Sequence, residues 1–281
     1  MEISIIGSGT MATGITQVLC VSHEVSKVNI IARTEEKAIA SKNICAKNIS
    51  RLARKGKISD EQASCALEKL YCSAELATVV HSDLIIEAIV EDFTSKMELF
   101  SKLAGFISES VIIASNTSSL SITAFASVLP NPQNVVGLHF FNPAPIMELV
   151  EIVVGHETNP TIVDKLQILT KALGKAPVVV QEAPGFVVNR MLIPMINEAV
   201  SILAEGVATA EDIDKAMKFG AHHPMGPLAL ADLIGNDVNL SIMETLYSET
   251  GDPKYRAHPL LRKMVRANHL GRKTKKGFFE Y

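Results

Sequence analysis

The chain has 281 residues, of which 47% are hydrophobic, and its formal net charge at pH 7 is −3. This length allows a large core and suggests one large or two medium domains. The slightly acidic balance excludes the global basic field that would attract nucleic acid or an anionic membrane surface. No run of about 18 apolar residues occurs, so we expect no membrane span.

The first residues, MEISIIGSGT, are typical of a strand and not of a signal peptide. The four cysteines, Cys20, Cys45, Cys65 and Cys72, form no CxxC pair and have no zinc-ligand spacing. We expect them to pack as small apolar side chains in a protein of the reducing cytoplasm, and we expect no metal site.

Short β-branched runs alternate with amphipathic stretches in the first two thirds of the chain. They predict strands at 2–7, 27–33, 83–88, 111–115, 134–141, 147–154 and 177–181. Helices are expected at 11–20, 34–69 (two helices divided near Gly56), 94–107 and 160–173. After a Pro-Gly break near 182–186, only helical patterns follow, at 187–205, 210–219, 227–248 and 259–268. The prediction is an α/β domain with a doubly wound, mostly parallel sheet over 1–182, and an all-α domain over 183–281.

A glycine-rich turn connects the first strand to the first helix. Gly7, Gly9 and Ala12 form a G-x-G-x-x-A pattern. Gly7 permits the tight turn, Gly9 lets the backbone approach a pyrophosphate at the helix N-terminus, and Ala12 permits close helix–strand packing. We therefore expect a Rossmann-type domain that binds a nicotinamide dinucleotide, with Thr10 and Met11 among the contacts. The alternative is an ordinary glycine turn.

The end of the second strand bears on which nucleotide is bound. A carboxylate at this position binds the ribose 2′-hydroxyl of NAD, but this chain has Ala32, Arg33 and Thr34 there. Arg33 and Thr34 are suited to a 2′-phosphate, because they offer a charged fork and a hydroxyl donor. The prediction is NADP, with NAD possible if Arg33 is only a solvated surface residue.

A histidine and a carboxylate stand on two successive predicted strands. His139 ends one strand and Glu151 lies in the next, and the intervening Asn-Pro-Ala-Pro segment suits a turn. A paired imidazole and carboxylate can move the hydroxyl proton in alcohol–ketone redox chemistry. A core histidine and a surface acid are the alternative from spacing alone. The hydroxyl-rich loop with Asn116 and Ser118 also follows a strand, where open α/β sheets bind ligands.

Long strings in both predicted domains resemble the L-3-hydroxyacyl-CoA dehydrogenase family, most of all its bacterial butyryl-type members. The strings include GSGTMATGI, EAIVED, ASNTSSLSIT, GLHFFNPAPIMELVEIV and EAPGFVVNRMLIPMINEA. The resemblance implies an enzyme that interconverts a short-chain (S)-3-hydroxyacyl-CoA, of four carbons, and its 3-keto form in butanoate metabolism. Its implied site residues are His139 as acid/base, Glu151 as its partner, Ser118 and Asn189 at the C3 oxygen, and Glu91, Lys96 and Asn116 at the cofactor.

The same resemblance makes the helical stretch 34–69 an arm that reaches toward CoA. Lys55 falls at a CoA-contacting position within the basic cluster of Arg51, Arg54, Lys55 and Lys57, and Asn48 lies on the same helix face. A solvated helix face is the alternative. The chain departs from the family pattern at Ala12, at Ala32, and at Glu148, where relatives often carry a basic residue.

The helices of the second domain are apolar on many sides, and the resemblance implies a homodimer built through them. A self-contained helical core would explain the same pattern. We expect no metal at His222, His223 or His258. Two other functions remain open: a dehydrogenase of a free hydroxy acid, and a non-catalytic nucleotide-binding protein.

Overall fold

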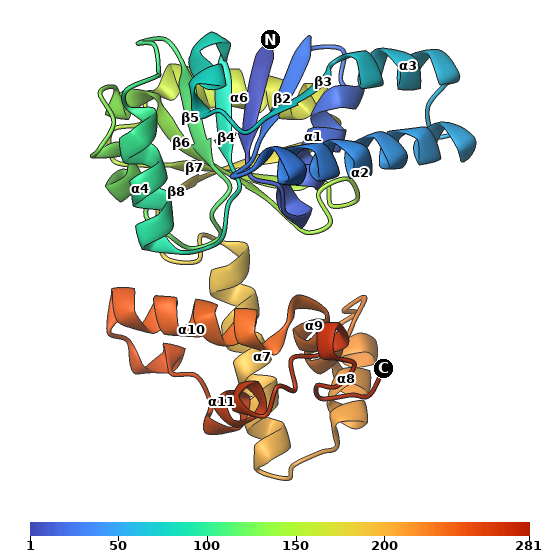
Figure 1. Ribbon diagram of the computed structural model, residues 1–281. Helices are drawn as coiled ribbons and strands as arrows, with labels where there is room; N and C mark the ends of the chain where they lie inside the picture. The colour runs from blue at the N-terminus through green and yellow to red at the C-terminus, as the bar shows by residue number, and fades with distance from the viewer. The chain divides into compact units, whose positions relative to one another are not determined.

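The computed structural model describes residues 1–281 and consists of two compact units, residues 1–182 and residues 183–281 (Figure 1). The first unit contains one eight-stranded sheet with the order β3-β2-β1-β4-β5-β6-β7-β8. The strands are β1 (Glu2–Ile6), β2 (Lys27–Ile31), β3 (Leu70–Ser73), β4 (Leu84–Glu87), β5 (Ile112–Ser115), β6 (Val135–Phe140), β7 (Leu149–Val154) and β8 (Ala176–Gln181). All neighbours are parallel except β6 and β7. The predicted doubly wound, mostly parallel fold is confirmed.

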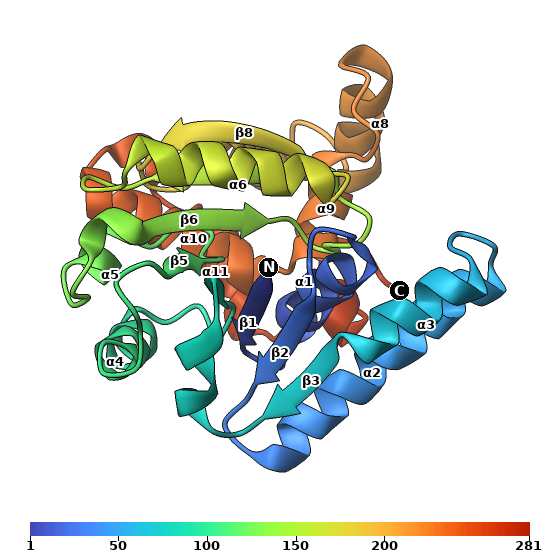
Figure 2. The ribbon, with the colours of Figure 1, turned by 90° about the horizontal axis from the view of Figure 1, so that it is seen from above.

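Helices cover both faces of this sheet (Figure 2). The helices are α1 (Thr10–Val21), α2 (Glu35–Arg54), α3 (Asp60–Glu68), α4 (Phe93–Leu103), α5 (Ile122–Ala126) and α6 (Pro160–Ala172). On one face, Ile15 and Leu19 of α1 and Leu166 of α6 join Ile3 and Ile5 of β1 in a single buried core. On the other, the Phe100 and Phe125 rings of α4 and α5 lie 4.9 Å apart. Side chains that alternate along each strand supply both cores.

The helical arm is a pair of helices, as predicted. Gly56 follows α2 with φ +64, a left-handed conformation that stops the helix. A capping box then starts α3, because Ser59 accepts from the Gln62 amide and the Gln62 side chain accepts from the Ser59 amide. Figure 2 shows the pair projecting past the β3 edge of the sheet.

The second unit contains helices and no named strand, as the sequence predicts. Its helices are α7 (Val188–Ala204), α8 (Ala210–Gly220), α9 (Pro227–Ile234), α10 (Asn236–Thr250) and α11 (Pro259–Arg266). One apolar cluster forms around Ile193, Met243 and Leu246. A second contains Leu228 and Leu261. None of the helices in the chain combines the length and the apolar composition that crossing a membrane requires.

Two predictions of secondary structure are wrong. The predicted helix 227–248 is two helices, α9 and α10, because Gly235 separates them with φ +108. The sequence also failed to predict β3. That strand has four residues, of which only Leu70 is buried, so it carries no alternating pattern. The short helix α5 and the 3₁₀ turn η1 (Leu76–His81) were also not predicted, because they too are too short to show a periodic pattern.

A buried carboxylate anchors the C-terminal tail to α9. Asp232 is 1% exposed and accepts from the amides of Phe278 (3.0 Å) and Phe279 (2.9 Å) and from the Tyr281 hydroxyl (3.2 Å). Gly277 is needed beside it, because a Cβ there would overlap the Asp232 carboxylate. Burial and the neighbouring Asp232 raise the pKa of Tyr281.

Replacing Asp232 with alanine should lower the free energy of unfolding by about 2–4 kcal/mol, because several buried donors lose their acceptor. Denaturant unfolding measures this change. Glu249→Ala, at an exposed position in the last turn of α10, is the control and should stay within about 0.5 kcal/mol of wild type. Equal stability of the two variants would show that the tail is not held by Asp232.

Candidate active site

Four loops gather at one edge of the sheet of the first unit. Strands β1, β2, β4, β5 and β6 are mutually parallel, so their carboxyl ends lie at the same edge. The loops that leave four of these strands begin at Gly7, Ala32, Ala88 and Asn116. Open α/β sheets bind ligands at this edge. The predicted cofactor and catalytic residues of the first unit lie on these loops, on the adjoining helices and on strands β6 and β7.

The turn after β1 has the shape that a dinucleotide requires. Gly7 has φ +141, and a Cβ on it would lie 2.8 Å from the carbonyl carbon of Ala88, so only glycine fits. A Cβ on Gly9 would meet open space instead. Helix α1 begins at Thr10 with no side-chain cap. Backbone N–H groups at such a helix start, next to open space, are suited to a pyrophosphate.

The end of β2 carries no carboxylate in contact with this turn. Ala32 is 7% exposed, and its amide donates to the Ser73 carbonyl at 3.1 Å. Thr34 is the N-cap of α2 and accepts from the Lys37 amide, and its hydrogen bond lowers the pKa of Glu36. Thr34 therefore has a structural role at the helix start. Arg33 is the exposed cation beside it.

The structure brings His139 and Glu151 together across the antiparallel pair β6–β7. The two residues are directly opposite in the register. The His139 Nδ1 lies 2.8 Å from the Glu151 Oε2, and both side chains are buried. With Glu151 ionised, its carboxylate only accepts hydrogen bonds, and the proton of this bond then lies on Nδ1. In acid–base chemistry of this imidazole, Nε2 would be the ring nitrogen that takes up a proton.

A lysine fixes the turn between these two strands. Lys175 Nζ donates to the carbonyls of Ala144 (2.7 Å) and Met147 (2.8 Å). Burial lowers the pKa of Lys175, and the nearby Glu148 opposes this effect. Glu148, one of the departures from the family pattern, thus has Lys175 as an electrostatic partner. Nothing in the sequence pattern indicated Lys175.

The loop after β5 is held by side chains from two directions. The Glu91 Oε1 accepts from the Thr117 hydroxyl (2.6 Å) and from the Ser118 amide (2.7 Å). Asn116, predicted as a cofactor contact, uses its Oδ1 to accept from the Phe140 amide at 2.8 Å. This bond ties the loop to the strand that carries His139. Sequence reasoning missed it, because it depends on how β5 and β6 lie in the sheet.

The remaining predicted residues lie on α2, α4 and α7 or directly at the end of one of these helices. Lys96 is 1% exposed, and its ammonium faces Glu87 and Glu91. Asn48 is half-buried on α2, and Lys55 is exposed at the C-terminus of the same helix. Asn189 lies in the first turn of α7, in the second unit. The roles given to these four residues stay predictions.

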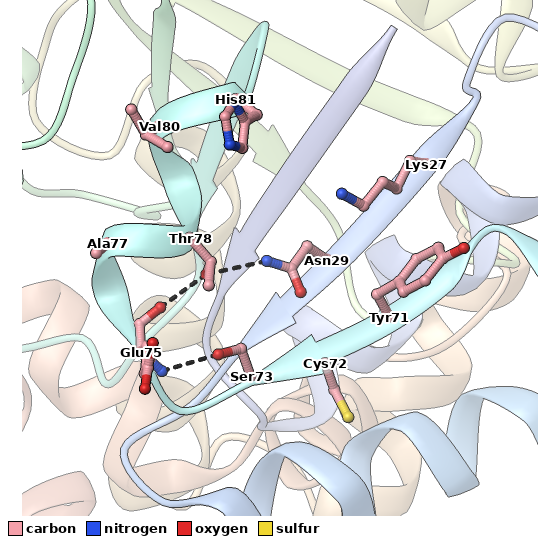
Figure 3. A pocket seen from close by; sticks show the side chains of 10 residues that line it. All are labelled: Lys27, Asn29, Tyr71, Cys72, Ser73, Glu75, Ala77, Thr78, Val80 and His81. Carbon is pink, nitrogen blue, oxygen red and sulfur yellow. Dashed lines mark hydrogen bonds between the residues drawn. The ribbon is translucent and has the colours of Figure 1, made fainter.

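A groove beside β2, β3 and η1 is a separate polar region of the first unit (Figure 3). Its polar groups mostly bond one another. Asn29 donates to the Thr78 hydroxyl, Thr78 donates to the Glu75 carbonyl, and the Glu75 amide donates to the Ser73 hydroxyl. It holds no paired acid and base, so the loop edge with His139 is the better candidate. No group of three or more histidine, cysteine or acidic side chains in the chain is placed to hold a metal ion.

Comparison with known proteins gives matches over the whole chain. Residues 2–183 match the family model "3-hydroxyacyl-CoA dehydrogenase, NAD binding domain", and residues 185–281 match "3-hydroxyacyl-CoA dehydrogenase, C-terminal domain". A 3-hydroxybutyryl-CoA dehydrogenase of Clostridioides difficile is 50% identical over 100% of this chain and 99% of its own length. The human mitochondrial hydroxyacyl-coenzyme A dehydrogenase is 40% identical, over 100% of this chain and 91% of its own. The crystal structure of (S)-3-hydroxybutyryl-CoA dehydrogenase from Ralstonia eutropha has a TM-score of 0.95 at 43% identity, covering 100% of this chain and 98% of that one.

The two fingerprint glycines should respond differently to alanine. Gly7→Ala should lower the melting temperature by several degrees, because its Cβ meets the Ala88 carbonyl and its φ is unfavourable for alanine. Gly9→Ala should keep the melting temperature and weaken dinucleotide binding by about tenfold or more, because its Cβ occupies the approach to the helix N-terminus. Thermal unfolding and fluorescence titration with reduced nucleotide separate the two effects. Unchanged nucleotide affinity in Gly9→Ala would place the pyrophosphate elsewhere.

Proposed function

The chain belongs to the 3-hydroxyacyl-CoA dehydrogenase family, and we propose that it interconverts (S)-3-hydroxybutanoyl-CoA and acetoacetyl-CoA with NADP(H). The observation that carries the proposal is the buried His139–Glu151 pair at the ligand-binding edge of a dinucleotide-binding sheet. The names of the relatives support the four-carbon substrate. The reaction belongs to butanoate metabolism and takes place in the cytoplasm.

In the direction of oxidation, His139 Nε2 takes the proton of the C3 hydroxyl. A bound nicotinamide would supply the hydride acceptor for C3. The imidazolium that forms is stabilised by Glu151, which already holds Nδ1–H at 2.8 Å. In the direction of reduction, His139 returns the proton to the C3 oxygen. The Ser118 hydroxyl donates to that oxygen and stabilises its developing negative charge. A similar donor role for the Asn189 amide stays a prediction from the family resemblance.

The arm formed by α2 and α3 supplies the contacts to CoA in this proposal. Lys55 stands at the end of α2, beside Arg51 and Arg54 in its last turn. Cations at a helix C-terminus also interact favourably with the helix dipole, so their charge there has a structural explanation as well. We assign the 3′-phosphate or pyrophosphate of CoA to Lys55 and a polar contact to Asn48 on the same face.

A homodimer built through the second unit completes the proposal. The apolar side chains Met191 (73% exposed), Val207 (69%) and Phe219 (76%) are largely open to solvent in the single chain. Large exposed apolar side chains of this kind mark interaction surfaces when they are contiguous.

NADP(H) is the proposed nucleotide, because Ala32 removes the carboxylate that would repel a 2′-phosphate, and Arg33 adds an exposed cation beside it. Glu91 and Lys96 are assigned to the nicotinamide side of the cofactor. Of these two, Glu91 is the more accessible, with 39% of its side chain exposed.

With acetoacetyl-CoA, the wild-type protein should oxidise the reduced nucleotide, and His139→Ala should lower kcat by about two to four orders of magnitude through loss of the acid/base group. Loss of nicotinamide absorbance measures both. His156→Ala is the control, because the His156 side chain is 80% exposed and His156 is not one of the proposed site residues.

If the protein reduces free acetoacetate and does not reduce acetoacetyl-CoA, its substrate is a free acid and not a CoA thioester. No turnover of either compound, despite tight nucleotide binding, would favour a non-catalytic role. An unchanged kcat in His139→Ala would remove that residue from the mechanism.

The wild type should prefer NADPH over NADH in kcat/KM by roughly tenfold, which corresponds to one charge-assisted contact to the 2′-phosphate. The double variant Ala32→Asp/Arg33→Ile should reverse the preference, because it introduces the ribose-binding carboxylate and removes the cation. Steady-state kinetics with both nucleotides checks this. A wild-type preference for NADH would contradict the cofactor proposal and leave the His139 chemistry unaffected.

A further inference from the structure

A buried carboxylate stands next to the loop that carries Ser118, and the acid–base chemistry does not use it. Glu87 is the last residue of β4 and is 0% exposed. Its Oε1 accepts from Lys96 Nζ at 2.5 Å and from the Ile89 amide at 2.7 Å, and its Oε2 accepts from the Ser115 hydroxyl at 2.6 Å. A buried charge is costly unless paired and hydrogen-bonded, so these contacts explain how Glu87 is tolerated. They do not explain why a charge is there.

Lys96 connects Glu87 to a second carboxylate. The Lys96 side chain is 1% exposed, and its ammonium lies 2.5 Å from the Glu87 Oε1 and 3.3 Å from the Glu91 Oε2. One buried cation is thus shared by two carboxylates from the same strand–helix connection. In a site of low effective dielectric, each carboxylate depends on that cation for its position.

The two carboxylates hold the Ser118 loop at its two ends. Glu87 bonds the Ser115 hydroxyl, which in turn accepts from the Thr117 amide at 3.3 Å. Glu91 binds the Thr117 hydroxyl and the Ser118 amide. Register adds a further constraint, because Glu87 and Ser115 are direct neighbours across β4 and β5.

The same loop is tied to the strand of His139. Asn116 lies between the two anchored ends, and its Oδ1 accepts from the Phe140 amide. The position of the Ser118 amide relative to His139 therefore depends on three linked elements: the Glu87–Lys96–Glu91 triad, the loop 115–118, and the Asn116–Phe140 bond.

We propose that Glu87 is a positioning residue for the dehydrogenase reaction, acting through Lys96 and Glu91 to place Ser118 relative to His139. This inference rests on the proposed function, because it assigns the loop's placement a consequence for turnover. Glu87 touches no reacting atom in it. Misplacement of a contacting group by about 1 Å can cost roughly a hundredfold in rate, so a residue of this kind has a measurable effect.

Glu87→Gln keeps the size of the side chain and one acceptor oxygen, and removes the charge that holds Lys96. We expect kcat at saturating substrate and nucleotide to fall by about tenfold to a hundredfold. The nucleotide dissociation constant should rise by a smaller factor than kcat falls. The turn that binds the pyrophosphate is not part of the triad, although Glu91 and Lys96 are assigned to the nicotinamide side of the cofactor. Glu98→Gln, at an exposed position of α4, is the matched control and should behave as wild type.

A double-variant cycle with Lys96→Met tests the route of the effect. If Glu87 acts through Lys96, the double variant Glu87→Gln/Lys96→Met should lose no more activity than the worse single variant. Losses that multiply would show that Glu87 acts independently of Lys96, and would overturn the proposal. A fall in melting temperature with unchanged kcat would also overturn it, because Glu87 would then serve stability alone.

Amide hydrogen exchange gives a readout that needs no substrate. In Glu87→Gln, the segment 115–120 should exchange at least about tenfold faster than in wild type. The reason is that Glu91, which accepts from the Ser118 amide, is no longer held in place by the triad. Exchange in α1 should stay unchanged. If wild type does not turn over acetoacetyl-CoA, the proposed function fails while this measurement still decides whether Glu87 orders the loop. Unaltered exchange of 115–120 would refute the positioning role in either case.

Discussion

The antiparallel pairing of β6 with β7 is the constraint on which the candidate site depends. Every other neighbouring pair in the sheet is parallel. Because β7 starts at the edge where β6 ends, Glu151 stands directly opposite His139 on the neighbouring strand, where facing side chains lie close together. Gly137 permits the close approach, since a Cβ there would lie 2.7 Å from the Cβ of Val153. The backbone register thus sets the geometry of the imidazole–carboxylate pair, with no contribution from a flexible loop.

Around that pair, the sheet edge concentrates buried ionisable groups. Glu87, Lys96, His139 and Glu151 are all nearly inaccessible, although each would be more stable in water than alone in the protein interior. Removing one member of such a pair leaves its partner uncompensated, at a cost of about 3–5 kcal/mol. Apolar side chains of similar size would stabilise the fold at least as well. The proposed acid–base and positioning roles would account for their presence at this edge and not in the middle of the sheet.

Elements with a periodic pattern or a glycine break can be predicted from the sequence. Contacts that depend on packing cannot. The alternation of strands and helices, the glycine turn and the break at Gly56 are local patterns, and the structure has them. Strand β3 is too short to show a pattern, and the end of α9 depends on the conformation of a single glycine, Gly235. Within the site, the proline-rich turn suggested that His139 and Glu151 meet. The Asn116–Phe140 and Lys175–Ala144 bonds join residues 24 and 31 positions apart, so no local pattern reveals them.

The structure distinguishes the two side chains that the sequence offers for nucleotide selectivity. Arg33 and Thr34 are both expected from the sequence to suit a 2′-phosphate. Thr34 caps α2, and its hydrogen bond lowers the pKa of Glu36, an exposed residue in the first turn of the same helix. Arg33 is therefore the side chain left to attract a 2′-phosphate, and the exposed Glu36 carboxylate opposes this attraction. In the proposal, discrimination at this strand end depends on Arg33 together with Ala32, where the absent carboxylate neither binds the ribose of NAD nor repels the phosphate of NADP.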